Sequence, residues 1–168
     1  KQLFHWGYLR GVTDWEQMTD LSKDLRGWLA ENLQIYRLGE SQAQQSEDGT
    51  RKFLWSLEDG KTIESVVIPA ALQVNDAGAE TQEHPRLTAC ISSQVGCAMK
   101  CSFCLTGIQG LDRSLNIHEI VTQVYELRRL APITNIVFMG MGEPLHNLDS
   151  IVIACQILLD NDGLRFSK

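Results

Sequence analysis

The chain has 168 residues, with 21 acidic and 15 basic side chains and a formal net charge of −6. This length suffices for one good hydrophobic core or two small ones, and the acidic balance does not indicate a nucleic-acid binder, because such proteins usually carry a basic patch. No apolar run is long enough to span a membrane and the start carries no signal-peptide pattern, which predicts a cytoplasmic protein without a membrane partner.

Residues 1 to about 35 are predicted to be helical, within an N-terminal segment that ends at residue 38. Asp14, with Gln17 three residues later, forms a plausible capping box. Apolar side chains recur at helical spacing on one face, and they are Met18, Leu21, Leu25, Trp28 and Leu29. We expect the polar, glycine-bearing residues 39–50 to be a linker.

A β-hairpin is predicted next, from two strand-like runs at 51–57 and 62–68 that are joined through Asp59-Gly60. A two-residue turn would pair Trp55 with Glu64 and Phe53 with Val66. Glu64 would then lie among apolar side chains, where loss of hydration raises the pKa of a carboxyl group toward the range of a general base. The alternative, which is commoner for a charged residue, is an edge glutamate that points into water.

The second half of the chain changes to strand–helix alternation after a polar loop at 70–86. Strands are expected at 87–93 and 133–139, and helices at 117–130 and 151–159, the first capped by Asn116 and Glu119. This order predicts an α/β fold with parallel strands and right-handed crossovers. We divide the chain into a helical segment (1–38), a hairpin with linker (39–86) and the βα units (87–168).

Two βα units cannot close a barrel. The chain begins at Lys1 and stops at Lys168 without a polar tail. We therefore expect a fragment of a longer protein whose remainder supplies the other strands.

The most informative feature is a loop reading GCAMKCSFC, in which Cys97, Cys101 and Cys104 are spaced C-x3-C-x2-C. Three thiolates on one loop can hold three corners of an iron–sulfur cube and leave the fourth iron open, which suggests chemistry at that iron. The alternatives are a zinc site completed by Cys90 or His118, and three unligated core thiols. Zinc sites usually show paired C-x2-C units, and only one triplet is present here.

A second constellation follows the strand at 133–139 and contains Gly140, Gly142, Glu143 and Pro144. Glycines at the carboxyl end of a strand let a ligand touch bare backbone, and a carboxylate there can accept hydrogen bonds from an ammonium group. Ligands of parallel α/β folds bind at this end of the sheet, so we expect this loop and the cysteine loop to face each other.

The cysteine loop, with Phe103 before its last cysteine, resembles the radical S-adenosylmethionine (SAM) superfamily. The longer strings CISSQVGCAMKCSFCLTG and NIVFMGMGEPLHNLD resemble the radical SAM adenosine methyltransferases of ribosomal and transfer RNA (the RlmN/Cfr type). The stretches MTDLSKDLR and QSEDGTRKFLWSLEDGKTIESVVIP resemble the N-terminal part of the same family. This resemblance implies that residues 87–168 are the first part of a radical SAM (β/α) barrel.

The resemblance also implies the cofactors and their ligands. Cys97, Cys101 and Cys104 match the residues that hold a 4Fe–4S cluster. Gly142 and Glu143 match the Gly-Glu pair that contacts SAM. In this family the cluster and SAM together generate the radical that the reaction needs.

Two further residues acquire roles only through the resemblance. Glu64 matches the family's catalytic proton acceptor. Cys90, which on sequence alone is interpreted as a small buried hydrophobe, matches the cysteine that forms a disulfide and so releases the product from its covalent link to the enzyme. The family's methyl-accepting cysteine, near its C-terminus, has no match here, and Cys155 is assigned to packing.

The implied reaction is methylation of carbon 2 of adenosine in 23S rRNA and tRNA, with a one-electron donor such as flavodoxin. One alternative is the related enzyme that methylates carbon 8 and confers antibiotic resistance. Another, from a different class, is a non-catalytic zinc-binding module.

Overall fold

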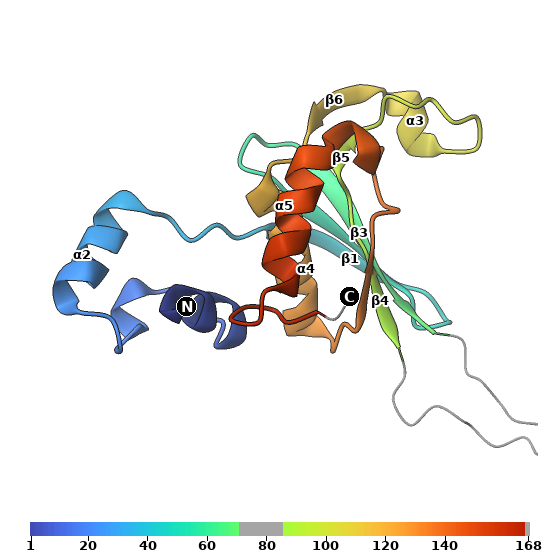
Figure 1. The fold of residues 1–168 in the computed structure, drawn as a ribbon. Coiled ribbons are helices and arrows are strands. Elements are labelled where there is room, and N and C mark those ends of the chain that lie inside the picture. Colours follow the sequence, from blue (N-terminus) through green and yellow to red (C-terminus); the bar gives the residue numbers. More distant parts are fainter. Residues whose placement is uncertain (71–85, 167–168) are drawn as a thin grey trace, which may run out of the picture.

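A single five-stranded sheet in the order β1-β2-β3-β4-β7 runs through the protein, with a separate two-stranded ribbon, β5-β6, beyond one end of it (Figure 1). The structure is a computed structural model that describes residues 1–70 and 86–166. No helix in these two ranges is both long and apolar enough to cross a membrane. Most of the polar loop predicted at 70–86 lies outside the described residues.

The N-terminal segment is a series of short turns and helices, so the prediction of helix up to about residue 35 is only partly correct. It contains α1 (Gln2–Phe4), a π-helical turn (His5–Leu9), a 3-10 turn (Trp15–Gln17) and α2 (Lys23–Asn32). Asp14 caps only the 3-10 turn, by accepting a hydrogen bond from Glu16, whereas Ser22 caps α2.

Because the segment is divided into separate turns and helices, the apolar side chains predicted to share one face do not all become buried. Met18, Leu21 and Leu29 form a small core with Trp6. Leu25 and Trp28, which the helical spacing placed beside them, are 40% and 54% exposed.

Residues 39–45, predicted as part of a linker, form strand β1 (Gly39–Gln45) at the edge of the sheet. Every residue of β1 is exposed. A strand that buries neither face has no apolar alternation in its sequence, which is why the pattern predicted a linker.

Strands β2 (Arg51–Ser56) and β3 (Thr62–Pro69) form the predicted hairpin, but the predicted pairing is wrong by one residue. Leu54 pairs with Glu64, and Trp55 pairs with Ile63. Because side chains alternate across a strand, the shift moves Glu64 to the face opposite Trp55.

The register differs from the prediction because the loop between β2 and β3 is one residue longer than expected. The amide of Leu57 donates to the carbonyl of Lys61 at 2.9 Å, and Gly60 has a φ of +79°. A three-residue loop, with glycine in the left-handed conformation, therefore replaces the two-residue turn that Asp59-Gly60 suggested.

The strand–helix order predicted for the second half is confirmed. Strand β4 (Leu87–Cys90) pairs antiparallel with β3 and parallel with β7 (Asn135–Val137), and helix α4 (Ile117–Leu130) connects the two parallel strands. Helix α4 begins with the predicted capping box, in which the amide of Asn116 donates to the Glu119 carboxylate at 2.7 Å. Helix α5 (Leu148–Leu159) begins three residues earlier than predicted, after a 3-10 turn (Pro144–Asn147).

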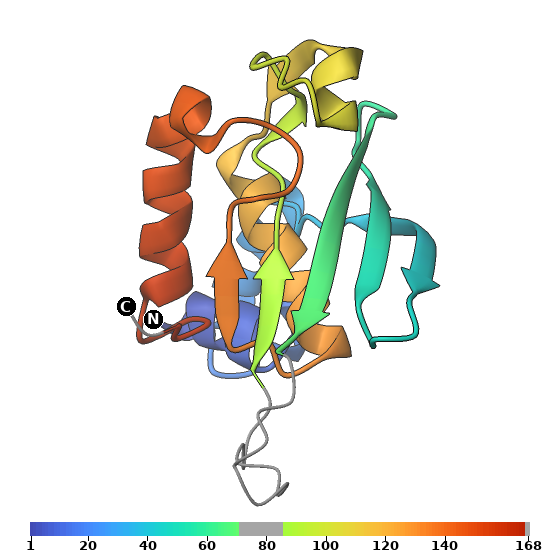
Figure 2. The ribbon, with the colours of Figure 1, turned by 90° about the vertical axis from the view of Figure 1, so that its right-hand side faces the viewer.

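The two faces of the sheet differ. Helix α4 lies behind the sheet and α5 lies beside α4 (Figure 2). Apolar residues of β2, β3 and β4, among them Trp55, Ile63 and Ala89, join the core on the helix side. The register places Glu64, Val66 and Cys90 on the other face, which no helix of the described residues covers.

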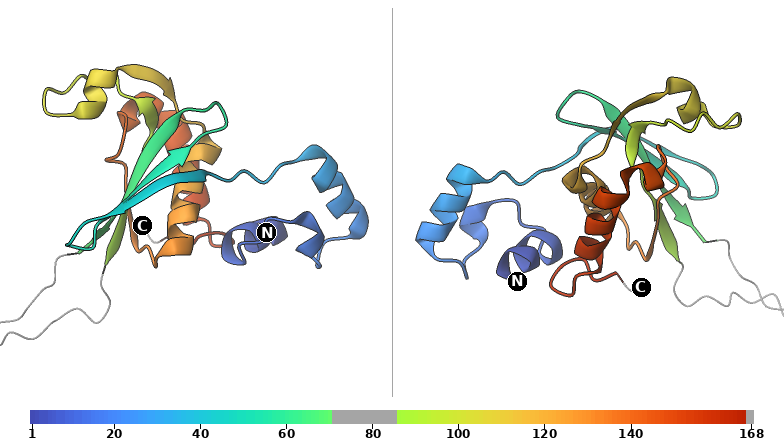
Figure 3. Two further views of the ribbon diagram at one scale, coloured as in Figure 1. Left: turned by 180° about the vertical axis from the view of Figure 1, so that it is seen from behind. Right: turned by 45° about the horizontal axis from the view of Figure 1, so that its top comes forward.

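The N-terminal segment extends to the side of this layer, next to α4 (Figure 3). The sheet itself continues from β3 into β4, across the boundary predicted between residues 86 and 87. The division into three parts remains a prediction. The described residues form a mixed α/β structure that corresponds to part of a barrel.

Candidate functional site

The cysteine loop is closed at its base by strands β5 (Gln94–Gly96) and β6 (Leu111–Ser114). The amide of Cys97 donates to the carbonyl of Gly110 at 3.0 Å. Gly96 has a φ of +75°, and a Cβ there would collide with the Gly110 carbonyl. Only glycine therefore fits immediately before the first cysteine.

The three cysteines of the loop are free thiols in different environments. Cys97 is buried, Cys101 is exposed, and Cys104 is half-buried at the start of α3 (Leu105–Gln109). The amide of Met99 donates to the sulfur of Cys97 at 3.5 Å. A backbone hydrogen bond from Gly107 lowers the pKa of the Cys104 thiol. The contact at Cys104 favours the thiolate form, which is the form that binds metal.

The glycine-rich loop after β7 is fastened to the segment that connects β4 to the cysteine loop. The amides of Ser93 and Gln94 donate to the carbonyl of Met141 at 2.8 and 3.2 Å, and the amide of Met141 donates to the hydroxyl of Ser92 at 2.9 Å. The amide of Gly140 donates to the carbonyl of Ile91 at 3.1 Å. The expectation that the two loops lie at the same end of the sheet is confirmed.

Gln94 joins the two loops through its side chain. Its oxygen accepts the amide of Glu143 at 2.9 Å, and its nitrogen donates to the hydroxyl of Ser114 at 3.3 Å. Gly142, at a φ of +101°, packs so closely that a Cβ would lie 2.6 Å from the Cβ of Gln94. The sequence does not reveal this role of Gln94, because a polar residue beside Val95 is indistinguishable there from an exposed one.

The Glu143 side chain is oriented by its own turn. One carboxylate oxygen accepts the amide of Leu145 at 3.0 Å, at the start of the 3-10 turn. The backbone around Gly142 and the half-buried carboxylate of Glu143 therefore stand next to the cysteine loop in a fixed arrangement.

Glu64 does not lie among aromatic side chains, so the predicted apolar environment is corrected. Its carboxylate forms an ion pair with Lys52, with Nζ and Oε1 3.1 Å apart, and the side chain is 41% exposed. Its carbonyl accepts the hydroxyl of Ser92 at 2.6 Å, which ties this point of β3 to the segment that leads to the cysteine loop.

Cys90 shares the uncovered face of the sheet with Glu64, and it pairs with Val66 on β3 and Val137 on β7. Burial raises the pKa of the Cys90 thiol, although a hydrogen bond from the amide of Met139 opposes this. Cys155 lies on α5, in the helix layer. All five cysteines are free thiols.

The fourth ligands considered for zinc lie away from the loop. His118 is in the first turn of α4, with its ring 4.5 Å from that of Tyr36 and nearly perpendicular to it, and Cys90 is in the sheet. Among residues 1–70 and 86–166, no three side chains of the ligand types His, Cys, Asp and Glu gather around one metal ion.

Comparisons with known proteins agree with this geometry. The sequence model of the "Radical SAM superfamily" matches residues 91–167, and that of the "Ribosomal RNA large subunit methyltransferase N-terminal domain" matches residues 1–35. A protein of Geobacter sulfurreducens named "Dual-specificity RNA methyltransferase RlmN" is 51% identical over 99% of the chain and 43% of its own length. The chain belongs to the RlmN-type radical SAM methyltransferase family.

Other members of the family match nearly the whole chain at similar identity. A protein of Pelobacter propionicus with the same name is 48% identical over 99% of the chain and 44% of its own length. The crystal structure of a radical SAM methyltransferase from Sphaerobacter thermophilus superposes with a TM-score of 0.80 at 40% identity, and covers 99% of the chain and 47% of that protein. The chain therefore spans less than half the length of these relatives.

The cysteine loop fits the 4Fe–4S cluster that membership of the radical SAM superfamily implies. The irons of a cluster occupy different corners, so its three ligands need not meet at one point as the ligands of a zinc ion must. Three free thiols on one loop, with amides directed at the sulfurs of Cys97 and Cys104, meet this requirement.

Proposed function

We propose that the whole protein is a radical SAM methyltransferase that methylates carbon 2 of adenosine in 23S rRNA and tRNA. The observation that carries the proposal is the joining of the cysteine loop to the Gly142-Glu143 loop at the carboxyl ends of β4 and β7. The names of the relatives, dual-specificity RNA methyltransferases, support the choice of substrate.

Cys97, Cys101 and Cys104 would hold a 4Fe–4S cluster and leave one iron free for SAM. When bound, the cluster and SAM supply the one-electron chemistry that carbon 2 requires, because this carbon is not a nucleophile. The bare backbone at Gly142 and the oriented carboxylate of Glu143 would bind the ammonium group of SAM. The side chain of Gln94 accepts the backbone amide of Glu143 and so holds Glu143 against the strand that leads to the cysteines.

Glu64 would accept the proton that leaves the adenine ring. Its carboxylate is on the uncovered face of the sheet and partly exposed, so a substrate entering from that side can reach it.

Cys90 would free the product by forming a disulfide, and this role needs a second thiol on the same face of the sheet. Cys155 does not supply it, because α5 packs in the helix layer. The proposed partner thiol therefore belongs to the part of the family that this chain does not span.

The proposed partners are 23S rRNA, tRNA and a one-electron donor such as flavodoxin, and the proposed location is the cytoplasm. These follow from the family and from the chemistry of a reducible cluster.

The decisive experiment is mass spectrometry of nucleosides from RNA treated with the whole protein, SAM and a reductant. We expect 2-methyladenosine from the wild type and none from Cys101→Ala, whereas Cys155→Ala should remain active. Formation of 8-methyladenosine instead would support the carbon-8 alternative, and unchanged product from Cys101→Ala would contradict the proposal.

A further inference from the structure

Two adjoining hollows lie where the N-terminal segment packs against helix α4. One has a volume of about 440 Å³ and the other a volume of about 300 Å³. Tyr8 and Tyr125 line both, so the two hollows share a wall. They extend along α4, from His118 in its first turn to Arg129 near its C-terminal end.

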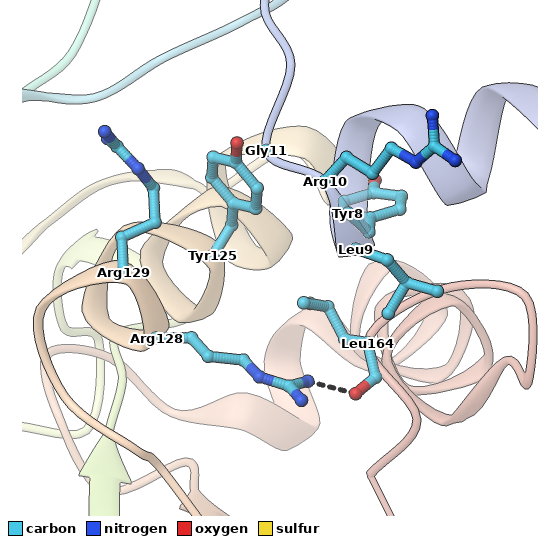
Figure 4. Close-up of a pocket in the computed structure, with 8 residues that line it drawn as sticks. All are labelled: Tyr8, Leu9, Arg10, Gly11, Tyr125, Arg128, Arg129 and Leu164. Atoms are coloured by element: carbon cyan, nitrogen blue, oxygen red, sulfur yellow. Dashed lines mark hydrogen bonds between the residues drawn. The ribbon is translucent and has the colours of Figure 1, made fainter.

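The larger hollow is basic. Arg10 of the N-terminal segment and Arg128 and Arg129 of α4 line it, with the guanidinium groups of Arg10 and Arg129 directed toward opposite sides (Figure 4). This brings together arginines that are more than a hundred residues apart in a chain of net charge −6. Arg129 pairs with Glu126 at 3.0 Å, but no carboxylate of the described residues pairs with Arg10 or Arg128.

These arginine side chains are held in place rather than free. The guanidinium of Arg10 lies 4.0 Å from the ring centre of Trp6. Arg128 donates to the carbonyl of Leu164 and lies 5.2 Å from the ring centre of Phe166. Each of these contacts leaves most of the five N–H donors of a guanidinium available to an anion.

The smaller hollow is aromatic. Its walls include Trp15, Tyr36 and His118 in addition to the two shared tyrosines. The hydroxyl of Tyr36 is buried and has no hydrogen-bond partner among the described residues. A buried polar group without a partner destabilises the protein, so a ligand that bonds to it would stabilise the site.

The pair of hollows matches the two halves of a nucleotide. Proteins bind unstacked RNA bases on aromatic side chains and hold the phosphates with arginine. We propose that the hollows form a second RNA contact, in which the arginines around the larger hollow bind backbone phosphates and the aromatic hollow takes an unstacked base of the same RNA. The inference rests on the proposed function for the identity of the partner as RNA.

The nucleotide bound here is not the one that reacts. Both hollows lie against α4 on the helix side of the sheet, whereas Glu64 and Cys90 lie on its other face. The contact therefore positions the RNA and takes no part in the chemical step.

The charge requirement is tested by measuring the affinity of the whole protein for its RNA across a range of salt concentrations. Arg10→Gln and Arg128→Gln should each weaken binding about fivefold at physiological salt, and should lower the slope of log affinity against log salt by about 0.7–0.9. Arg10→Lys, which keeps the charge, should retain the wild-type slope. Lys23→Gln makes the same charge change on α2, outside the hollow, and should have little effect.

The base requirement is tested with Tyr36→Phe, which removes only the hydroxyl. Loss of one hydrogen bond of about 1 kcal/mol corresponds to about fivefold weaker RNA binding, here with an unchanged salt slope. At saturating RNA, kcat should be unchanged in Arg10→Gln, Arg128→Gln and Tyr36→Phe while KM rises, because the reaction site is intact.

The outcomes separate this inference from the proposed function. Wild-type affinity and slope in folded Arg10→Gln and Arg128→Gln would overturn the RNA contact, even if the protein methylates RNA. RNA binding that weakens as expected, in a protein that yields no methyladenosine, would support the contact and overturn the proposed function. A wild-type protein that does not bind RNA would overturn both.

Discussion

At the scale of single residues, the candidate site depends on groups that neither bind a cofactor nor react. Gln94 is the main example, because its buried side chain satisfies the amide of Glu143 and contacts Ser114. The cysteine triplet and the Gly-Glu pair could be predicted from the sequence because their spacing is local. The role of Gln94 could not, because its partners are 20 and 49 residues away.

Replacement of Gln94 by leucine should separate the two loops. The amide of Glu143 loses its acceptor, so we expect the free energy of unfolding to fall by about 1–3 kcal/mol. In the whole protein, the affinity for SAM should fall while the iron content is retained. Denaturant unfolding and SAM titration measure the two effects, and Gln156→Leu on the exposed side of α5 serves as the control.

A pair of glycine substitutions tests the geometry at the base of the cysteine loop. Gly96→Ala forces a methyl group onto the carbonyl of Gly110 at a positive φ, which should cost about 1–3 kcal/mol and lower the cluster content after anaerobic loading with iron and sulfide. Gly27→Ala in helix α2 meets no atom within 4 Å and should stabilise the protein by about 0.5–1 kcal/mol. Equal effects of the two changes would contradict this account of the loop.

At the scale of elements, an ionic network fastens the hairpin to the site. Arg113 on β6 binds Asp59 in the β2-β3 loop at 2.7 Å and the buried Glu119 of the α4 capping box at 2.8 Å. Lys61 pairs with Asp112 beside them. The strand that carries Glu64 is thereby fixed to the strand that leaves the cysteine loop.

Breaking this network at its centre should destabilise the fold. Arg113→Ala leaves the Glu119 carboxylate, which is 3% exposed, without its charge partner. We expect a loss of about 3 kcal/mol in the free energy of unfolding, as for other buried pairs with one partner removed. Arg51→Ala, which removes an arginine of β2 that forms no ion pair with the described carboxylates, should cost less in the same denaturant titration.

The Arg113–Asp59 pair also predicts a dependence on pH. The hydrogen bond from Arg113 lowers the pKa of Asp59 below the usual value of a carboxyl group. A carboxyl group with a lowered folded-state pKa stabilises the protein above its unfolded pKa, and this contribution is lost as the pH falls through the folded-state pKa. The difference in unfolding free energy between the wild type and Asp59→Asn should therefore be present at neutral pH and vanish in acid.

The elements show where sequence patterns were sufficient. Helix α4 was predicted with its bounds and cap because its apolar spacing and its Asn116–Glu119 box are local signals. Strand β1 was missed because it buries no side chain. The hairpin register was wrong because Asp59-Gly60 suits both a two-residue turn and the last part of a three-residue loop.

At the scale of the whole molecule, the sheet has one covered face and one uncovered face. The helices cover the side of Trp55 and Ile63, and the candidate residues Glu64 and Cys90 lie on the other side. Sequence alone predicted the parallel βα units. It could not predict which face would remain accessible, because that depends on how three sequence-distant strands align in register.

The uncovered face and the last strand in the sheet order, β7, also predict how the isolated chain behaves. A terminal strand presents unpaired amides and carbonyls to other chains. We expect the 168-residue chain alone to self-associate as its concentration rises, and longer chains that include the family's following strands to do so less. Size-exclusion chromatography coupled to light scattering measures the effect, and a 168-residue chain that stays monomeric throughout would contradict it.

The three-residue loop at 58–60 has a chemical consequence beyond the shape of the hairpin. Removing one of its residues would shift the register of β3 by one residue. The Glu64 carboxylate would then turn toward the apolar helix side and Ile63 toward the uncovered face. A deletion that leaves the hairpin itself intact would thus exchange the Glu64 carboxylate for a hydrocarbon side chain on the uncovered face. Under the proposed function, the number of residues in this turn would therefore determine whether the proposed proton acceptor Glu64 lies on the uncovered face.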